Sequence, residues 1–313
     1  MTNDDGSSQG DSIDRATPPL VSLIVPVRNG AARIGRCIEA LLDQTYPRDR
    51  YEVIIVDNGS DDGTQEIIRS YPVTLLEETS AASPYVARNL GLRHARGEIY
   101  AFTDGGCVPR SDWLAQGVHS LEQGADFAGG RVTFEMPAEP TAAEIYDSLV
   151  NIQMEDAVRK RKVGKGCNLF FRKAVFDRIG PWPEQRSGGD VLHTATATSE
   201  GFRIVYAERA EVLYPTRTFR PLLRKSLRVG LGHPYQWDTR GWRLFVRVLR
   251  IAVLIWKPPS KAHIRELMQR DGHECDSRRV AAVWRVAWAS SIAAKLGHLY
   301  SGTRILLGLG RTP

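Results

Sequence analysis

The chain has 313 residues, 42% of them hydrophobic and 25% charged, which is the composition of an ordinary globular protein with a sizeable core. Its four cysteines form no C-x-x-C pair, which argues against a structural zinc site and a disulfide framework. The net charge of +6 hides an asymmetry, because residues 217–313 hold 19 Lys and Arg against 5 Asp and Glu. This tail carries +14 and residues 1–216 carry −8, so we expect the two parts to meet different partners.

The first 19 residues are polar and acidic. They have neither the basic start nor the apolar stretch of a signal peptide, and we expect residues 1–19 to be a disordered leader. We therefore predict a cytoplasmic protein.

Apolar runs alternate with helical patterns between residues 20 and 104. Strands are predicted at 20–27, 51–56, 73–76 and 98–103, and helices at 34–46, 65–71 and 84–96. This alternation predicts an α/β fold with a mostly parallel sheet and helices on both faces. Ligands of such sheets bind beyond the carboxyl ends of the strands, where Asn29, Asp57 and Asp104 all lie.

Asp104 is the most informative single residue, because it stands between the end of a predicted buried strand and two glycines, Gly105 and Gly106, whose backbone can approach a ligand closely. A carboxylate in this apolar context is costly to bury without a partner. We therefore expect Asp104 to be a site residue.

Several motifs in a fixed order carry a resemblance to a known family. They are Val-Pro-Val-Arg-Asn-Gly at 25–30, Val-Asp-Asn-Gly-Ser-Asp-Asp-Gly-Thr at 56–64, Ala-Arg-Asn-Leu-Gly at 87–91, Phe-Thr-Asp at 102–104, Gly-Lys-Gly-Cys-Asn at 164–168, Arg-Ile-Gly-Pro-Trp at 178–182 and Gly-Gly-Asp at 188–190. Over residues 20–230 the chain resembles the family 2 glycosyltransferases of the GT-A fold, which is Rossmann-like. The resemblance implies a nucleotide-sugar-binding half at 20–135 and an acceptor-binding half at 136–230. The implied reaction is inverting transfer of a sugar from a nucleotide-sugar donor to a hydroxyl acceptor.

The resemblance also implies which residues contact the donor: Pro26, Asn29, Asp57, Arg88, Asp104, Gly105 and Asn168. Asp57 is expected at the nucleobase or ribose, with an Asx turn as the alternative. Arg88 is expected at a phosphate, because a guanidinium matches phosphate geometry, with an ion pair to Glu77 or Glu78 as the alternative.

Asp190 is the expected catalytic base, which removes the proton of the acceptor hydroxyl. The family has a Glu-Asp pair here, but Gly189 replaces the glutamate. A carboxylate at a helix N-terminus also stabilises the helix, and the two roles are compatible. His193, three residues further on, is expected to be structural.

The metal site departs from the family pattern. Asp104 is the one expected metal ligand, for Mg²⁺ or Mn²⁺, because Gly106 replaces the second carboxylate of Asp-x-Asp and Tyr214 stands where a histidine is usual. Asp104 and the diphosphate can hold the cation weakly, with Arg88, Lys165 or a basic residue of 217–228 neutralising the leaving group. Alternatively, the chain is a catalytically impaired homologue that binds nucleotide sugar or serves as the partner subunit of an active transferase.

Residues 231–313 are predicted to be a basic, amphipathic helical extension. Arg243, Arg247 and Arg250 fall on one helical stripe, and apolar residues cover the opposite side. This pattern favours an anionic membrane surface, with the protein peripheral at the inner face of the cell membrane. No apolar run reaches the roughly 18 to 20 residues that span a bilayer. The alternatives are helices that cover the head or form a dimer seam. Nucleic acid is not expected, because no nucleic-acid motif accompanies the basic residues.

Residues 141–163 connect the two halves. They are predicted to be one long polar helix, acidic at its start and basic at its end, in accord with the helix dipole.

Overall fold

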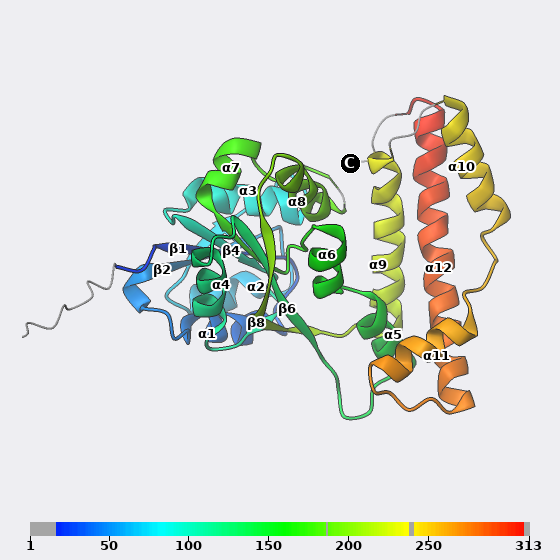
Figure 1. Ribbon diagram of the computed structural model, residues 1–313, viewed down its shortest axis with the longest axis horizontal. Coiled ribbons are helices and arrows are strands. Elements are labelled where there is room, and N and C mark those ends of the chain that lie inside the picture. Colours follow the sequence, from blue (N-terminus) through cyan, green and yellow to red (C-terminus); the bar gives the residue numbers. More distant parts are fainter. Residues whose placement is uncertain (1–16, 186, 238–240, 310–313) are drawn as a thin grey trace, which may run out of the picture.

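The computed structural model describes residues 17–185, 187–237 and 241–309. A head built on one sheet carries helices on both sides, and a layer of helices from the end of the chain stands beside it (Figure 1). Of the predicted leader, residues 1–16 lie outside the described residues.

The sheet has eight strands in the order β3-β2-β1-β4-β7-β6-β8-β5. The first four in chain order pair in parallel: β1 (Val21–Val27), β2 (Tyr51–Asp57), β3 (Thr74–Glu77) and β4 (Ile99–Thr103). The others are β5 (Val108–Pro109), β6 (Phe127–Glu135), β7 (Asn168–Arg172) and β8 (Ile204–Pro215). Strand β7 is antiparallel to both β4 and β6, while β6 and β8 run parallel. The predicted α/β sheet is thus confirmed, and its second half is mixed.

Both faces of β1 are buried, which explains its continuous apolar run. Val21, Leu23 and Val25 pack in one core cluster, whereas Ile24 packs in another with Phe102 and Trp182. Each fully buried Val, Leu or Ile side chain contributes about 1.5–3 kcal/mol relative to an exposed one. The covering elements are α1 (Ile34–Leu42), η1 (Arg48–Arg50), α2 (Thr64–Arg69), α3 (Pro84–His94), α4 (Trp113–Glu122), α7 (Lys173–Ile179) and α8 (Gly189–Ser199).

The prediction of one helix over 141–163 is wrong. Thr141 and Glu144 form a capping box that starts α5 (Ala142–Val150), but the chain then breaks before α6 (Met154–Arg161). Ile152 has a φ of 49°, in the left-handed region, which a continuous right-handed helix cannot contain. The break turns α6 toward the head sheet, and Met154 and Val158 join its core.

The C-terminal layer contains α9 (Phe219–Gly232), η2 (His233–Gln236), α10 (Gly241–Val253), α11 (Lys261–Arg270) and α12 (Ser277–Leu306). Helices α9 and α12 touch through their backbones, because a Cβ at Gly230 would lie 2.1 Å from the carbonyl oxygen of Ala294. The predicted boundary between residues 230 and 231 falls inside α9. Among the described residues, none of the helices combines the length and the hydrophobicity that a membrane-spanning helix requires.

Candidate functional site

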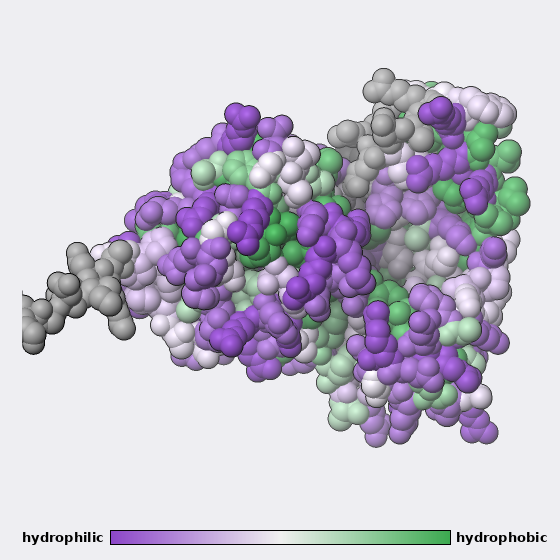
Figure 2. Space-filling view, viewed as in Figure 1, coloured by the Kyte–Doolittle hydropathy of each residue, from purple (hydrophilic) through white to green (hydrophobic). Residues whose placement is uncertain are grey.

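Two cavities meet at Asp104, where β4 ends. The first, of about 690 Å³, lies at the loops that follow β1 and β4, beside the end of β8, and we call it the donor-side cavity because residues expected to contact the donor line it. The second, of about 390 Å³, lies between α8 and α9, and we call it the acceptor-side cavity because Asp190, the expected base, lines it. Figure 2 shows the surface hollowed between the head and the C-terminal layer. Asp104, Tyr214 and Arg217 line both cavities.

Arg88 forms an ion pair with Asp104. Its Nη2 atom lies 2.7 Å from Oδ1 of Asp104 and 3.1 Å from the carbonyl oxygen of Gly166. The Arg88 side chain is 4% exposed, whereas that of Asp104 is 36% exposed where the cavities meet. A Cβ at Gly166 would lie 2.8 Å from the guanidinium carbon, so the glycine lets the chain pass against Arg88.

The expected alternative partners of Arg88 are occupied elsewhere. Glu77 pairs with Arg69, and Glu78 accepts hydrogen bonds from Ser80. The carboxylate that neutralises Arg88 is therefore the one at the end of β4.

Asp190 lies in the first turn of α8 and lines the acceptor-side cavity. Its Oδ2 accepts from the backbone N–H of Gly166 at 2.9 Å, and its Oδ1 accepts from the Tyr85 hydroxyl at 3.1 Å. The N-cap of α8 is Gly188. Burial, reinforced by the charge of Asp190, raises the pKa of Tyr85, which keeps the hydroxyl protonated as a donor.

Tyr85 also explains the glycine at position 189. A Cβ at Gly189 would lie 3.0 Å from the Tyr85 ring and 3.0 Å from the carbonyl oxygen of Pro183. A larger side chain would require these neighbours to move. Tyr85 therefore stands beside Asp190 in place of the glutamate that the family pattern implied, a contact that the sequence did not reveal.

A Cβ fits at Gly106 without a clash, because it would make ordinary van der Waals contacts with Pro215 at 3.5 Å and Arg33 at 3.8 Å. Tyr214 is buried, and its hydroxyl accepts from Arg217. Burial raises the pKa of Tyr214, so it is not an anionic ligand at neutral pH. Within the described part of the chain, no three His, Cys, Asp or Glu residues gather as a metal site.

Three other predicted donor contacts line the donor-side cavity: Pro26, Asn29 and Gly105. Asn29 has a φ of 50°, which asparagine tolerates better than most residues. Its backbone N–H donates to Ser60 Oγ at 2.8 Å, and its Oδ1 accepts from the N–H of Asp61 at 3.0 Å. Asn29 thus ties together the loops that follow β1 and β2.

Asp57 and Asn168 lie outside both cavities. The buried Asp57 carboxylate accepts from Ser60 and from Gln65 Nε2 at 2.8 Å, contacts that match the turn alternative. The amide of Asn168 is buried. Its Oδ1 accepts a hydrogen bond from Trp113 Nε1, and its Nδ2 donates to the carbonyl oxygens of Arg131 and Ala210. It thereby holds the irregular pairing of β6 and β8, which is a structural role.

Helix α9, the end of α6 and the loop after α6 place cations in the acceptor-side cavity: Arg161, Lys165, Lys225 and Arg228. Beneath them lies Asp147 of α5, fully buried, whose Oδ2 accepts from Arg217 N at 3.0 Å and from Arg217 Nη1 at 3.3 Å. Asp147 went unnoticed in the sequence. The available signal was a carboxylate between the apolar positions Ile145 and Leu149 of an expected helix.

His193 lines neither cavity. Its ring packs 4.5 Å from the centroid of Trp182 and 4.7 Å from that of Phe176. Burial lowers the pKa of His193 to about 4, so the ring is neutral at neutral pH.

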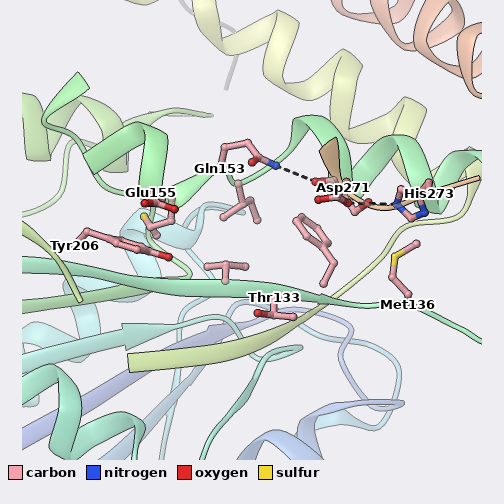
Figure 3. A pocket seen from close by; sticks show the side chains of 12 residues that line it. Thr133, Met136, Gln153, Glu155, Tyr206, Asp271 and His273 are labelled. Atoms are coloured by element: carbon pink, nitrogen blue, oxygen red, sulfur yellow. Dashed lines mark hydrogen bonds and ion pairs between the residues drawn. The ribbon is translucent and has the colours of Figure 1, made fainter. Parts of the chain in front are cut away.

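A third cavity, of about 370 Å³, lies between β6, α6 and the loop after α11. Glu155, Asp271 and His273 face it, and Asp271 pairs with His273 at 3.3 Å (Figure 3). None of the residues predicted for the site lines it.

The mixed α/β sheet with its helical C-terminal layer is a GT-A-like fold. Residues 22–180 match "Glycosyl transferase family 2", and the chain belongs to this family. It is a nucleotide-sugar glycosyltransferase.

The similarity to known proteins extends over nearly the whole chain. Glycosyltransferase AglE of Haloferax volcanii is 39% identical over 295 residues, which are 91% of this chain and 96% of AglE. The mannosyltransferase PcManGT of Pyrobaculum calidifontis, solved with GDP-Man and Mn²⁺, has a TM-score of 0.61 at 23% identity, covering 91% of this chain and 88% of its own. S. aureus TarS with UDP-GlcNAc has a TM-score of 0.52 at 16% identity, covering 92% of each chain. At these identities the two solved structures establish the fold.

Proposed function

We propose that the enzyme transfers a sugar with inversion, with the nucleotide in the donor-side cavity and the acceptor hydroxyl in the acceptor-side cavity. One observation carries the proposal: Asp104 and Asp190, 86 positions apart in the chain, line the same cavity. The sugar then lies between the strand end that faces the diphosphate and the carboxylate that serves as base.

The chain's own residues supply the chemistry of the transfer. Asp190 takes the proton of the acceptor hydroxyl as the oxygen attacks the anomeric carbon, and the bond to the diphosphate breaks on the opposite side. The Gly166 N–H and the Tyr85 hydroxyl fix the Asp190 carboxylate in place. Arg88 and Arg217, which line this cavity, stabilise the negative charge that develops on the diphosphate.

A divalent cation fits this site if it binds together with the diphosphate of the sugar donor. Mg²⁺ and Mn²⁺ accept one or two carboxylates together with phosphate oxygens. Asp104, partly exposed at the junction of the cavities, offers one carboxylate, and Gly106 adds none. When bound, the cation would neutralise charge on the diphosphate. Asp104 would hold it, and the diphosphate would supply most of the other oxygens.

The Asp190→Asn variant tests this proposal. We expect transfer to fall by at least about a thousandfold, because the amide cannot accept the proton, while nucleoside diphosphate affinity stays within about twofold. The matched control is Asp177→Asn on the exposed surface of α7, which should behave as wild type. Unchanged turnover of the Asp190 variant would remove the base assignment. Nucleotide binding without turnover by the wild-type chain would favour the catalytically impaired alternative.

We also propose that α10 rests on an anionic membrane surface at the inner face of the cell membrane. Large apolar side chains lie exposed on and just after α10: Trp242, Phe245, Val246, Leu249, Val253 and Trp256. Figure 2 shows hydrophobic surface gathered along the outer side of this helix. Arg243, Arg247 and Arg250 of the same helix would meet acidic headgroups.

Vesicle sedimentation tests the membrane contact. The full chain should pellet with phosphatidylcholine vesicles that contain phosphatidylglycerol, and less with phosphatidylcholine alone. The double variant Trp242→Ser, Leu249→Ser should pellet several-fold less. Leu192→Ser, at a residue 43% exposed on α8, is the control. Undiminished pelleting of the double variant would overturn this proposal.

A further inference from the structure

The acceptor-side cavity holds more cations than its carboxylates neutralise. Apart from Arg228, which has a contact of its own, five of the described residues that line it are Lys or Arg and two are acidic: Arg88, Arg161, Lys165, Arg217 and Lys225 against Asp104 and Asp190. Asp104 pairs with Arg88, and the buried Asp147 pairs with Arg217. Arg161 and Lys165 have no acidic partner within 4.0 Å in the described part of the chain.

Lys225 is the most demanding of these cations. Its Nζ atom is buried and has no hydrogen-bond partner among the described residues. The nearest carboxylate oxygen, Oδ1 of Asp147, is 3.8 Å away and already accepts from Asn151. An ammonium in this position lacks the oxygens that water would give it, so an anionic ligand in the cavity would satisfy it. Burial and the charge of Arg217 lower the pKa of Lys225 to about 7, in accord with a missing anion.

The position of these cations separates them from the donor. Lys225 and Arg228 project from α9 into the acceptor-side cavity and do not line the donor-side cavity. The junction between the two cavities, at Asp104 and Arg217, is where the donor diphosphate belongs in the proposed function. Lys225, together with Arg161 and Lys165, therefore lies on the acceptor's side of Asp104.

We propose that the acceptor carries a phosphate group and that Lys225, with Arg161 and Lys165 nearby, binds it. This inference rests on the proposed function for the assignment of the cavity to the acceptor. The phosphate is a recognition group and takes no part in bond making, which remains at the hydroxyl beside Asp190. A phosphate of this kind can belong to a lipid headgroup or to a soluble sugar phosphate.

Calorimetric titration of the full chain tests the inference with octyl phosphate and glucose 6-phosphate as probes, and with octanol and glucose as their uncharged parents. We expect the phosphates to bind and their parents not to bind. Saturating UDP or GDP should leave phosphate affinity unchanged within about twofold. Tighter binding of octyl phosphate would identify a lipid headgroup as the source, and tighter binding of glucose 6-phosphate a soluble sugar phosphate. Either order supports a phosphate site.

Lys225→Met should weaken phosphate binding at least about tenfold. Lys160→Met makes the same exchange on α6 outside the cavity, where Lys160 pairs with Asp156, and should change nothing. If the Lys225 variant does not fold, Arg161→Gln at the exposed rim should weaken binding several-fold. Unchanged affinity in the folded variant, or displacement of the phosphate by UDP or GDP, would overturn the inference.

The test separates this inference from the proposed function. Asp190→Asn should keep phosphate affinity while losing transfer. Two results together would separate the claims: Lys225→Met loses phosphate binding, and Asp190→Asn keeps transfer. They would support the phosphate site and refute the assignment of Asp190 as the base.

Discussion

Nη2 of Arg88 lies 2.7 Å from Oδ1 of Asp104, and this ion pair joins a buried helix to the edge of the sheet where the cavities meet. Nε of Arg88 is buried and has no hydrogen-bond partner within the described residues. The carboxylate at the end of β4 therefore has two tasks. It neutralises a cation that cannot reach water, and it faces the place proposed for the diphosphate.

Asp104→Asn should lower the stability of the fold as well as the transfer activity. Removing one partner of a buried ion pair costs about 3–5 kcal/mol, because the other charge remains buried. We expect a loss near the lower end of that range, since Asp104 is partly exposed. Urea unfolding measures it. The double variant Asp104→Asn, Arg88→Met should recover part of the loss, and a purely additive double variant would contradict the coupling.

Gly106→Asp should strengthen cation binding. The site has room for the side chain, and the variant supplies the second carboxylate. We expect Mn²⁺ affinity in the presence of nucleoside diphosphate to rise at least about tenfold, or about 1.4 kcal/mol. Titration calorimetry measures the affinity. Gly106→Asn, which has the same shape without the charge, is the control, and equal Mn²⁺ affinity of the two variants would show that the cation does not bind beside position 106.

Tyr85→Phe should lower kcat about tenfold and leave KM for the donor nearly unchanged. The variant removes the hydroxyl that donates a hydrogen bond to Asp190, and a hydrogen bond to a charged group contributes about 1.5–3 kcal/mol. Steady-state kinetics separates kcat from KM. Tyr100→Phe, in the same aromatic core but against Phe176, should behave as wild type. If both variants lose activity equally, the effect is one of packing.

The strands could be predicted closely, because a strand that is buried on both faces has a continuous run of apolar residues in the sequence. The expected strand at 51–56 is observed at Tyr51–Asp57, and that at 98–103 at Ile99–Thr103. The edge that gathers Asn29 and Asp104 then follows from parallel topology, whereas the order of the strands was not predicted.

The rest depends on contacts between distant segments, which periodicity does not encode. The pattern of residues 141–163 does not predict the left-handed backbone conformation of Ile152, which breaks the helix. Asn168 follows a family motif, yet its amide is used to hold two strands together. The basic tail suggested a surface partner, whereas α9 turns two of its cations, Lys225 and Arg228, into the cavity of Asp190.

Lys225 makes stability depend on pH in a defined direction. Its pKa falls from 10.5 to about 7 on folding, so the unfolded chain binds more protons between these values, and the free energy of unfolding rises with pH across that interval. The groups that face the ammonium are Arg217 and Arg228 of the same segment, Lys165 of the loop after α6, and Asp147 of α5. Below the folded pKa the cost is fully present, up to about 5 kcal/mol at about 1.36 kcal/mol per pKa unit.

Lys225→Met removes this cost, so the variant should be more stable than wild type at about pH 6, and the difference should shrink by several kcal/mol toward about pH 10. Urea unfolding of both proteins across this range measures the difference. Lys160→Met, whose partner Asp156 is exposed, should show no such trend. A stability difference that stays constant with pH would mean that water reaches the Lys225 ammonium, because only a desolvated amine gives up its proton so readily.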